Sequence, residues 1–346
     1  MSWKTYTLLV ILIFFNQYRA CPYPLTPSLK YTLLNVSMRQ TVVADVIKVL
    51  DNFDGMTITV DKQFLPQLCC DMMNLGHRIK EIIFRAGSIG YIEATCFSRS
   101  VQNVMERIDF SFNALTSIKS STFKHLEIAE LWLSDNFIAT LGDGAFFNLT
   151  KLRMLSLEKN NLQVLNSEAF SSLSSLQSLY LGHNCIRNLQ RGALNFLARD
   201  AVVSLNCNQI IQIGNFLEGI SLKIKLNLEL NGNKIESFSG NIVENRTFQI
   251  LNLANNPLKN ISAVLSSAKI DRLEFFCGYL SLKDVQSVVN WAKARGILLL
   301  TNRCSQYNIS FGLASSTISC SSTRMALNSN NYYLLYLSIF LVVNEI

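Results

Sequence analysis

Residues able to act as general acids or bases near neutral pH are scarce in this sequence. The 346 residues include three histidines, and none stands in the H-E-x-x-H spacing of a zinc protease. The sequence also lacks a glycine-rich phosphate-binding loop and a G-x-S-x-G nucleophile elbow. Because isolated histidines are more often surface residues than catalytic bases, we predict no catalytic residue, no metal site, no cofactor and no enzymatic activity.

Charge of one sign is not concentrated anywhere along the chain. Charged residues make up 16% of the sequence and give a formal net charge of +7, without a run of lysine and arginine. A basic patch or stripe is what proteins use to bind a phosphate backbone. We therefore predict no nucleic-acid partner.

No apolar run is long enough to cross a bilayer as a helix, which takes about 20 residues. The first run, residues 8–15, follows Lys4 and precedes a polar stretch that ends at Ala20. A basic start, a short apolar centre and a small residue at the cleavage site are the layout of a secretory signal peptide. We expect residues 1–20 to be removed on secretion.

The last apolar run, residues 332–343, would extend about 18 Å as a helix, short of the roughly 30 Å of bilayer hydrocarbon. A polar spacer, residues 324–331, separates it from the small residues at 321–323. This order matches a glycosylphosphatidylinositol attachment signal. We expect a polar stalk over residues 305–331 with lipid attachment at Ser321, and a hydrophobic tail over residues 332–346. A retained membrane tail and a fully secreted chain remain open alternatives.

Cysteines and glycosylation sequons agree with the secretory route. Nine cysteines in an oxidising compartment indicate disulfides. We expect Cys277 to pair with Cys304, which would stabilise the fold by roughly 3–4 kcal/mol. Four N-terminal cysteines leave three connectivities open: Cys21, Cys69, Cys70 and Cys96. Five N-x-S/T sequons are expected to carry glycans, at Asn35, Asn148, Asn245, Asn260 and Asn308.

The pattern L-x-x-L-x-L-x-x-N-x-L recurs through the middle of the chain. Its asparagines are separated by 23, 24, 24, 24, 25 and 23 residues. They are Asn113, Asn136, Asn160, Asn184, Asn208, Asn233 and Asn256. Such a period is the signature of leucine-rich repeats, each a short strand followed by a looser return segment.

One clear copy of the pattern gives its physical meaning. Leu155 and Leu157 alternate along a strand, so both point inward, while Asn160 stands where the chain turns. We expect the asparagine amides to bond backbone groups of adjacent coils and form a ladder through the stack. A periodic row of phenylalanines is interpreted as core rather than as a ligand pocket: Phe97, Phe123, Phe146 and Phe170.

The pattern predicts an α/β solenoid, a right-handed horseshoe with a parallel sheet on its concave side. Weaker copies at both ends extend it to about nine repeats over residues 79–280. Residues 21–78 carry no full repeat and are expected to form an N-terminal cap. Ser281 and Asp284 resemble a capping box for a C-terminal helix, which Gly296 would end, so we expect a helical cap over residues 281–304.

Strand residues that do not point inward form the candidate contact surface on the concave face. Trp132 and Tyr180 stand at equivalent places two coils apart, the composition of a binding hot spot. Solvent-facing aromatics also simply favour strand formation, so both interpretations stay open. The candidate residues are Arg107, Asp109, Phe112, Glu130, Trp132, Asp135, Arg153, Met154, Glu158, Tyr180 and His183.

Cys185 and Cys207 stand beside the asparagine positions of neighbouring coils. A bridge between them is conceivable, but stacked register alone does not fix the directions of the sulfurs. We favour two free buried thiols.

The repeats resemble those of animal extracellular leucine-rich-repeat proteins with 24-residue repeats, insect ones included. The resemblance covers roughly residues 79–304 and is carried by A-F-x-x-L at 145–149 and 169–173 and by the segment from Cys277 to Cys304 with Trp291 inside it. Adhesion molecules, co-receptors and immune proteins of this kind bind partners and lack an active site. The resemblance therefore implies a recognition protein on the extracellular side of the plasma membrane with a protein ligand or co-receptor. The alternative is a soluble secreted factor of innate immunity.

Overall fold

The chain divides into two units, Met1–Ser315 and Ser316–Ile346, of which the second lies outside the described residues. Strands before residue 69 and at 312–313 are described by their backbone alone. The computed structural model describes residues 30–33, 36–39, 56–61, 67–68, 79–85, 89–93, 97, 104–124, 126–189, 191–211, 213, 216–237, 245–261, 268–302 and 312–313. The expected signal peptide, lipid-attachment residue and hydrophobic tail therefore fall outside these ranges, as do Cys21, Cys69, Cys70, Cys96, Cys304, Asn35 and Asn308.

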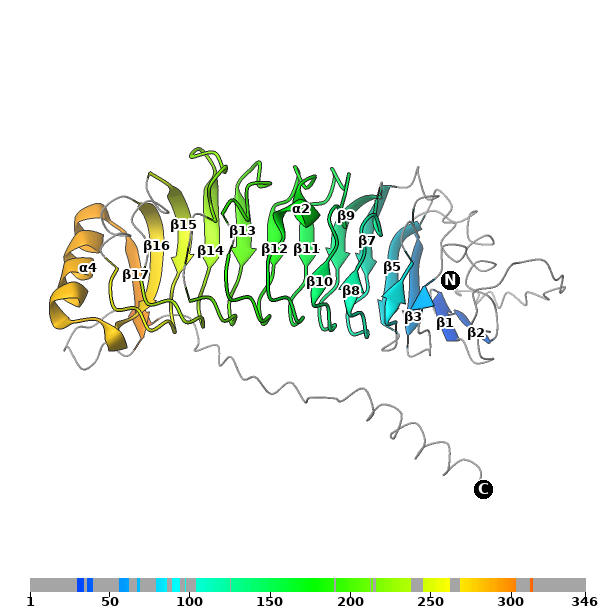
Figure 1. The fold of residues 1–346 in the computed structure, drawn as a ribbon, viewed down its shortest axis with the longest axis horizontal. Coiled ribbons are helices and arrows are strands. Elements are labelled where there is room, and N and C mark those ends of the chain that lie inside the picture. The colour runs from blue at the N-terminus through cyan, green and yellow to red at the C-terminus, as the bar shows by residue number, and fades with distance from the viewer. Residues whose placement is uncertain are drawn as a thin grey trace, which may run out of the picture. The chain divides into compact units, whose positions relative to one another are not determined.

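One 14-stranded sheet runs the length of the described solenoid, and from β3 to β18 its strands follow one another in chain order, while β1 lies between β3 and β2 at the N-terminal edge (Figure 1). Nine parallel strands match the nine predicted repeats. They are β5 (Ile79–Arg85), β7 (Val104–Asp109), β9 (Glu127–Trp132), β11 (Met154–Ser156), β12 (Ser178–Tyr180), β13 (Ala201–Ser204), β14 (Lys225–Glu229), β15 (Thr247–Asn252) and β16 (Lys269–Phe276). The predicted leucine-rich-repeat solenoid is confirmed.

Additional strands extend the sheet beyond the predicted repeats at both ends. At the N-terminal end, β3 (Met56–Asp61) pairs in parallel with β5, and the hairpin of β1 (Lys30–Leu33) and β2 (Val36–Arg39) closes the edge. At the other end, β17 (Leu298–Asn302) and β18 (Gly312–Leu313) add two parallel strands. The segment expected to be a stalk therefore contributes a strand to the sheet at residues 312–313.

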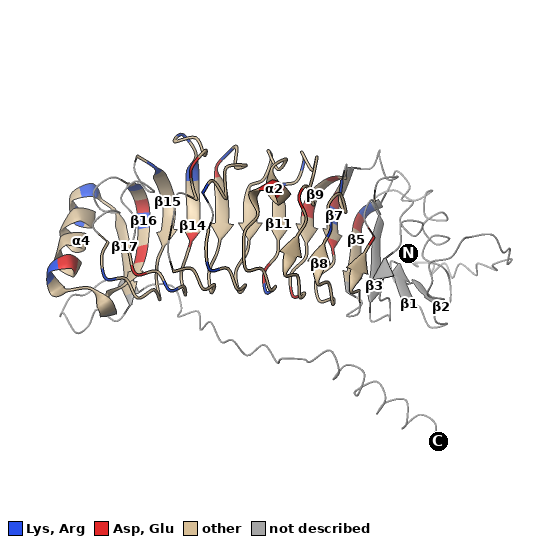
Figure 2. Cartoon of the chain, viewed as in Figure 1, with Lys and Arg blue, Asp and Glu red and all other residues tan. Residues whose placement is uncertain are grey.

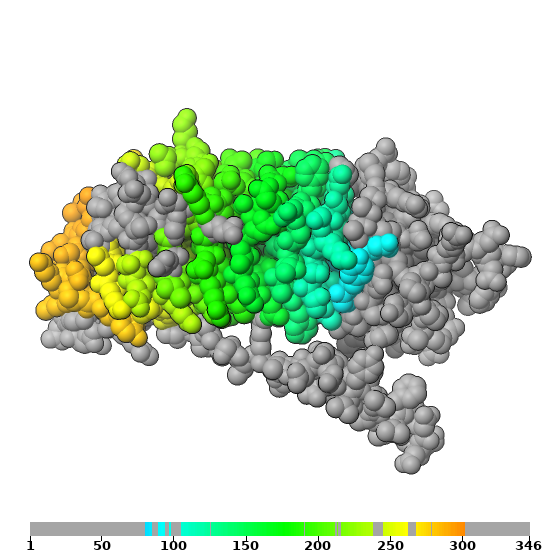
Figure 3. Space-filling model, viewed as in Figure 1, coloured from blue at the N-terminus to red at the C-terminus, as the bar shows by residue number. Residues whose placement is uncertain are grey.

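The core lies between the sheet and the return segments. Leu155 and Leu157 are fully buried, as the phasing requires. The predicted phenylalanine row is core as well: Phe123 lies 5.6 Å from Phe97 and 6.1 Å from Phe146 between ring centroids, and Phe146 lies 5.6 Å from Phe170. Successive coils therefore share one continuous apolar interior, and Figure 3 shows them stacked in chain order as adjoining slabs.

The predicted asparagine ladder is present at all seven positions. Asn136 is typical: its Nδ2 donates to Phe110 O at 2.9 Å in the preceding coil and to Leu133 O at 3.1 Å in its own. Its Oδ1 accepts a hydrogen bond from Leu115 N at 3.1 Å. Because these backbone groups are buried and have no strand partner, the ladder satisfies them and joins each coil to the one before it.

The described parts of the return segments contain little helix. Short bridges join some of them, β4 (Gln67–Leu68) to β6 (Tyr91–Ile92) and β8 (Ser117–Ile118) to β10 (Thr140–Leu141). The one α-helix in a described return segment is α2 (Ser167–Phe170). Within the described residues, no helix is long and apolar enough to span a membrane.

Helix α4 (Leu282–Arg295) covers the C-terminal end of the stack, following the short 3-10 helix η2 (Cys277–Tyr279). Ser281 Oγ accepts a hydrogen bond from Asp284 N at 3.1 Å, so the expected N-terminal cap forms. The helix ends at Gly296, whose φ of 64° is a left-handed conformation that glycine adopts without strain. The apolar face of the helix is buried, through Val285, Val288, Val289 and Ala292.

Candidate functional site

Strand register fixes which exposed side chains lie beside one another on the concave face. Trp132 pairs with Ser156, and Ser156 with Tyr180, so the two aromatics occupy one row with a serine between them. Two strand spacings place their Cα atoms about 10 Å apart. From β7 to β16 the row consists of Asp109, Trp132, Ser156, Tyr180, Ser204, Glu229, Asn252 and Glu274.

Trp132 is held in place by charged neighbours. The guanidinium of Arg107 lies over its ring, 4.7 Å from the centroid, and the indole Nε1 donates to Glu130 Oε2 at 3.1 Å. Arg107 is fixed in turn by Asp109, whose Oδ2 lies 2.8 Å from Arg107 Nη2. The half-exposed indole is therefore ordered before any partner arrives, which lowers the entropy that binding would cost.

Asp109 does not belong to the contact surface, and the prediction was wrong for this residue. Its side chain is fully buried, since Oδ2 binds Arg107 and Oδ1 accepts a hydrogen bond from Ser111 N at 2.8 Å. The carboxylate therefore binds the same Arg107 guanidinium that lies over the Trp132 ring. The other ten candidate residues are exposed or partly exposed.

Small residues lie between and beside the two aromatics. A Cβ on Gly182 would lie 2.2 Å from Asn206 Oδ1, so this place admits only glycine while Asn206 keeps its position. Ser134 and Ser156 are buried and joined through their hydroxyl oxygens at 2.6 Å. Trp132 and Tyr180 therefore flank a low, hydroxyl-lined floor.

Glu158 lies beside this floor in an environment that opposes its ionisation. Burial raises its pKa above the ordinary 4.5, the nearby carboxylates of Asp135 and Glu229 raise it further, and Lys159 acts against them. The middle coils therefore carry a carboxyl group that is more easily protonated than an ordinary glutamate.

The residue before each ladder asparagine forms a stripe with left-handed backbone that the sequence analysis missed. Six non-glycine residues there have φ between 52° and 60°: Phe112, Asp135, Lys159, His183, Cys207 and Asn255. The first five donate their backbone N–H groups to carbonyl oxygens of the following coil. Three of them, Phe112, Asp135 and His183, were predicted as contact residues. Because the six share no side-chain type, no composition signal marks the stripe.

The cysteine predictions are corrected in part. Cys185 is free and half-buried, as a thiol. Cys207 is disulfide-bonded, so the expectation of two free thiols is wrong for Cys207, and so is a bridge between the two. Cys277 is disulfide-bonded as expected, while its predicted partner Cys304 lies outside the described residues.

Three predicted glycosylation sites fall within the described chain. Asn148, Asn245 and Asn260 are exposed, and none lies on a strand of the sheet. Glycans at these positions would leave the concave row uncovered. Among the described residues, no group of three or more His, Cys, Asp or Glu side chains is placed to hold a metal ion.

Charges of both signs alternate along the solenoid, and no single sign covers the described strands (Figure 2). Arg107 lies beside Glu130 and Asp109 near β7, and Arg272 pairs with the buried Glu274 at 2.5 Å within β16. A partner would therefore meet local charge pairs rather than one uniform field.

Comparisons with known proteins agree with this fold. Residues 103–162, 127–186 and 151–210 each match the family model "Leucine rich repeat". No curated protein matches the sequence. A crystal structure of a TLR13–ssRNA13 complex is similar with a TM-score of 0.52 and 20% identity over 68% of this chain and 38% of that chain. The APL1 leucine-rich repeat domain is similar with a TM-score of 0.50 and 20% identity, over 67% and 57%.

The chain spans less than two thirds of the length of both solved structures. At 20% identity these likenesses concern the fold, which is typically a binding scaffold without enzymatic activity. Its strands, its asparagine ladder and the matches over residues 103–210 together make this chain a leucine-rich-repeat solenoid.

Proposed function

We propose that the chain is an extracellular recognition protein that binds a protein partner on its concave face, at the cell surface, as an adhesion molecule or co-receptor. The observation that carries the proposal is the placement of Trp132 and Tyr180 in one register row around Ser156. Aromatic anchors that are ordered in advance and rimmed by charges are the usual centre of a protein interface. Similarity to the repeats of animal extracellular proteins, with their 24-residue period, supports the same role.

The test is a binding screen against a panel of cell-surface ectodomains, repeated with variants. Trp132→Ala and Tyr180→Ala should each weaken the partner's affinity by more than about 1 kcal/mol, roughly fivefold, with secretion unchanged. Phe147→Ala is the matched control, because Phe147 is an aromatic with 46% of its surface exposed in a return segment. Parent-like binding by both variants would remove the concave row from the proposal.

A soluble secreted factor of innate immunity is the second candidate, favoured by the resemblance to immune leucine-rich-repeat proteins. The two candidates differ in anchoring. Phosphatidylinositol-specific phospholipase C should release a lipid-anchored chain from intact cells, and Ser321→Pro should abolish the attachment. Attachment that resists the enzyme indicates a retained tail, and constitutive secretion indicates the soluble factor.

The similar TLR13 structure is a complex with a single-stranded RNA, ssRNA13. A single-stranded RNA oligomer therefore belongs in the binding screen as a separate arm. We expect it not to bind, because the concave face presents carboxylates at Glu130, Glu158 and Glu229 that repel phosphate.

A further inference from the structure

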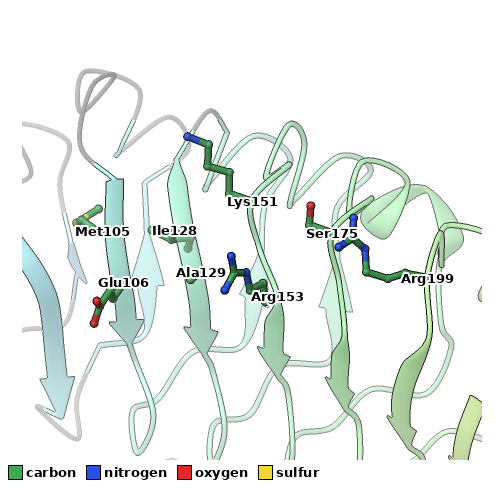
Figure 4. Close-up of a pocket in the computed structure, with 8 residues that line it drawn as sticks. All are labelled: Met105, Glu106, Ile128, Ala129, Lys151, Arg153, Ser175 and Arg199. Carbon is green, nitrogen blue, oxygen red and sulfur yellow. The ribbon is translucent and has the colours of Figure 1, made fainter.

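A groove of about 490 Å³ lies at the N-terminal ends of the strands, over the coils of β7 to β13 (Figure 4). Met105 and Ile128, both fully buried, close its bottom. The groove is separate from the aromatic row, which lies further along the strands.

Two small residues open the groove. Ala129 lies beside Arg153, whose N–H donates to Ala129 O at 2.8 Å. Ser175, Lys151 and Arg199 occupy equivalent places in three neighbouring coils. Each stands three residues before a strand residue of the same register row, which consists of Ser178, Met154 and Val202. Small side chains at these two places, between long ones in the adjoining coils, leave the space that the groove occupies.

The groove carries cations that are not neutralised by the described residues. Lys151 is paired with Glu127 at 2.8 Å, but Arg153 and Arg199 are exposed and form no ion pair within the described part of the chain. In Figure 4 both guanidinium groups are directed toward the lower-numbered coils, and that of Arg199 reaches toward Ser175. Two guanidinium forks and a hydroxyl donor therefore face one open space.

At the opposite end of the groove the charges are already paired: Glu106 lies 3.0 Å from Lys80, and Glu127 lies 2.8 Å from Lys151. Among the described lining residues, the unpaired cations are therefore Arg153 and Arg199 alone. A sulfated glycan or a nucleic acid carries many closely spaced anions and would place some of them at the paired end, where no free cation receives them. A peptide with two separate acidic side chains matches the two arginines and adds no charge at the paired end.

We propose that this groove binds an extended acidic peptide segment, with two carboxylates on Arg153 and Arg199. The assignment rests on the proposed function, since it gives the chemistry of one segment of the protein partner. The coils of Arg153 and Arg199 are two strand spacings apart, about 10 Å, which an extended peptide covers in about three residues. The acidic side chains of the ligand should therefore stand two to four positions apart.

The experiment selects a random linear-peptide library on the full-length protein and measures the affinities of the enriched peptides by calorimetry. Enriched sequences should carry acidic pairs at that spacing, and Arg153→Gln/Arg199→Gln should lower their affinity at least tenfold. Lys223→Gln/Lys234→Gln is the matched control, because it removes two exposed cations of other coils outside the groove and should leave affinity within twofold. Circular dichroism melting establishes that each variant is folded.

Two kinds of result would overturn the assignment. The first is that the peptide prediction fails, either because the selected peptides are not enriched in acidic pairs or because the double glutamine variant binds them with unchanged affinity. The second is tighter binding of a heparin-derived oligosaccharide or a single-stranded RNA oligomer that depends on the same arginines, which would make the groove a polyanion site. Trp132→Ala/Tyr180→Ala separates this inference from the proposed function: peptide binding should survive that change, whereas partner binding should not.

Discussion

The side chain of Asn160 ties its coil to the coil before it, since its Nδ2 lies 2.9 Å from Leu133 O. The same nitrogen also donates within its own coil to Leu157 O at 3.0 Å, and its Oδ1 accepts from Ile138 N at 2.9 Å. All of these groups are buried, so the bonds are not exchanged for bonds to water. The ladder therefore couples the stability of neighbouring coils.

Asn160→Ala should destabilise the protein by at least about 2 kcal/mol, because each orphaned buried group costs about 1–3 kcal/mol. Urea unfolding of the purified variant measures the loss. Asn161→Ala is the control next to it, since Asn161 is half-buried and has one long side-chain contact, 3.5 Å to Phe137 O. Equal stability of the two variants would mean that the ladder contributes little.

Gly182→Ala should lower stability by about 1–3 kcal/mol, because the new Cβ would overlap Asn206 Oδ1. Asn206 cannot turn away freely, since Ser204 Oγ donates to that oxygen at 2.6 Å. Thermal melting of a double-mutant cycle with Asn206→Ala tests the contact: the cost of the alanine should largely disappear in that background. An undiminished cost would place the strain elsewhere.

Cys185 alone among Cys185, Cys207 and Cys277 should react with iodoacetamide in denaturant without reductant, as peptide mass spectrometry would show. Cys207→Ser should destabilise the fold by about 2–4 kcal/mol, and Cys185→Ser by less than about 1 kcal/mol. Alkylation of Cys207 before reduction would contradict its bonded state.

Glu158 should make the protein less stable as pH rises through the interval between its ordinary pKa of 4.5 and its raised value in the fold. The sign follows because the folded state holds this proton more tightly than the unfolded state, so deprotonation favours unfolding. Glu158→Gln should therefore raise stability at neutral pH and flatten this part of the profile, measured by urea midpoints from pH 4 to pH 8. A steeper profile in the variant would reverse the assignment.

The fold was predictable because each repeat position has a strict physical requirement. Leu157 must be apolar to be buried, and Asn160 must both donate and accept to satisfy backbone in two coils. Because the same requirements recur in every coil, the sequence repeats the same residue types at a fixed period, and the period predicts the fold.

The site was less predictable because its properties depend on neighbours in other coils. The alternation of side chains along a strand predicts that Asp109 is exposed. Its carboxylate instead binds Arg107 and the Ser111 N–H, and the side chain is fully buried. The bonded state of Cys207 depends on a cysteine distant in sequence, and the groove depends on Ala129 and Ser175 meeting longer side chains across coils. No pattern within one repeat contains this information.

Hydroxyl-radical footprinting of the protein, with and without the first partner found by the ectodomain screen, tests the concave-face account most directly. Both Trp132 and Tyr180 keep exposed area in the free chain and should lose much of their oxidation in the complex, while the exposed Phe147 ring should not change. Unchanged oxidation of both Trp132 and Tyr180 in a saturated complex would contradict the account and place the interface elsewhere on the molecule.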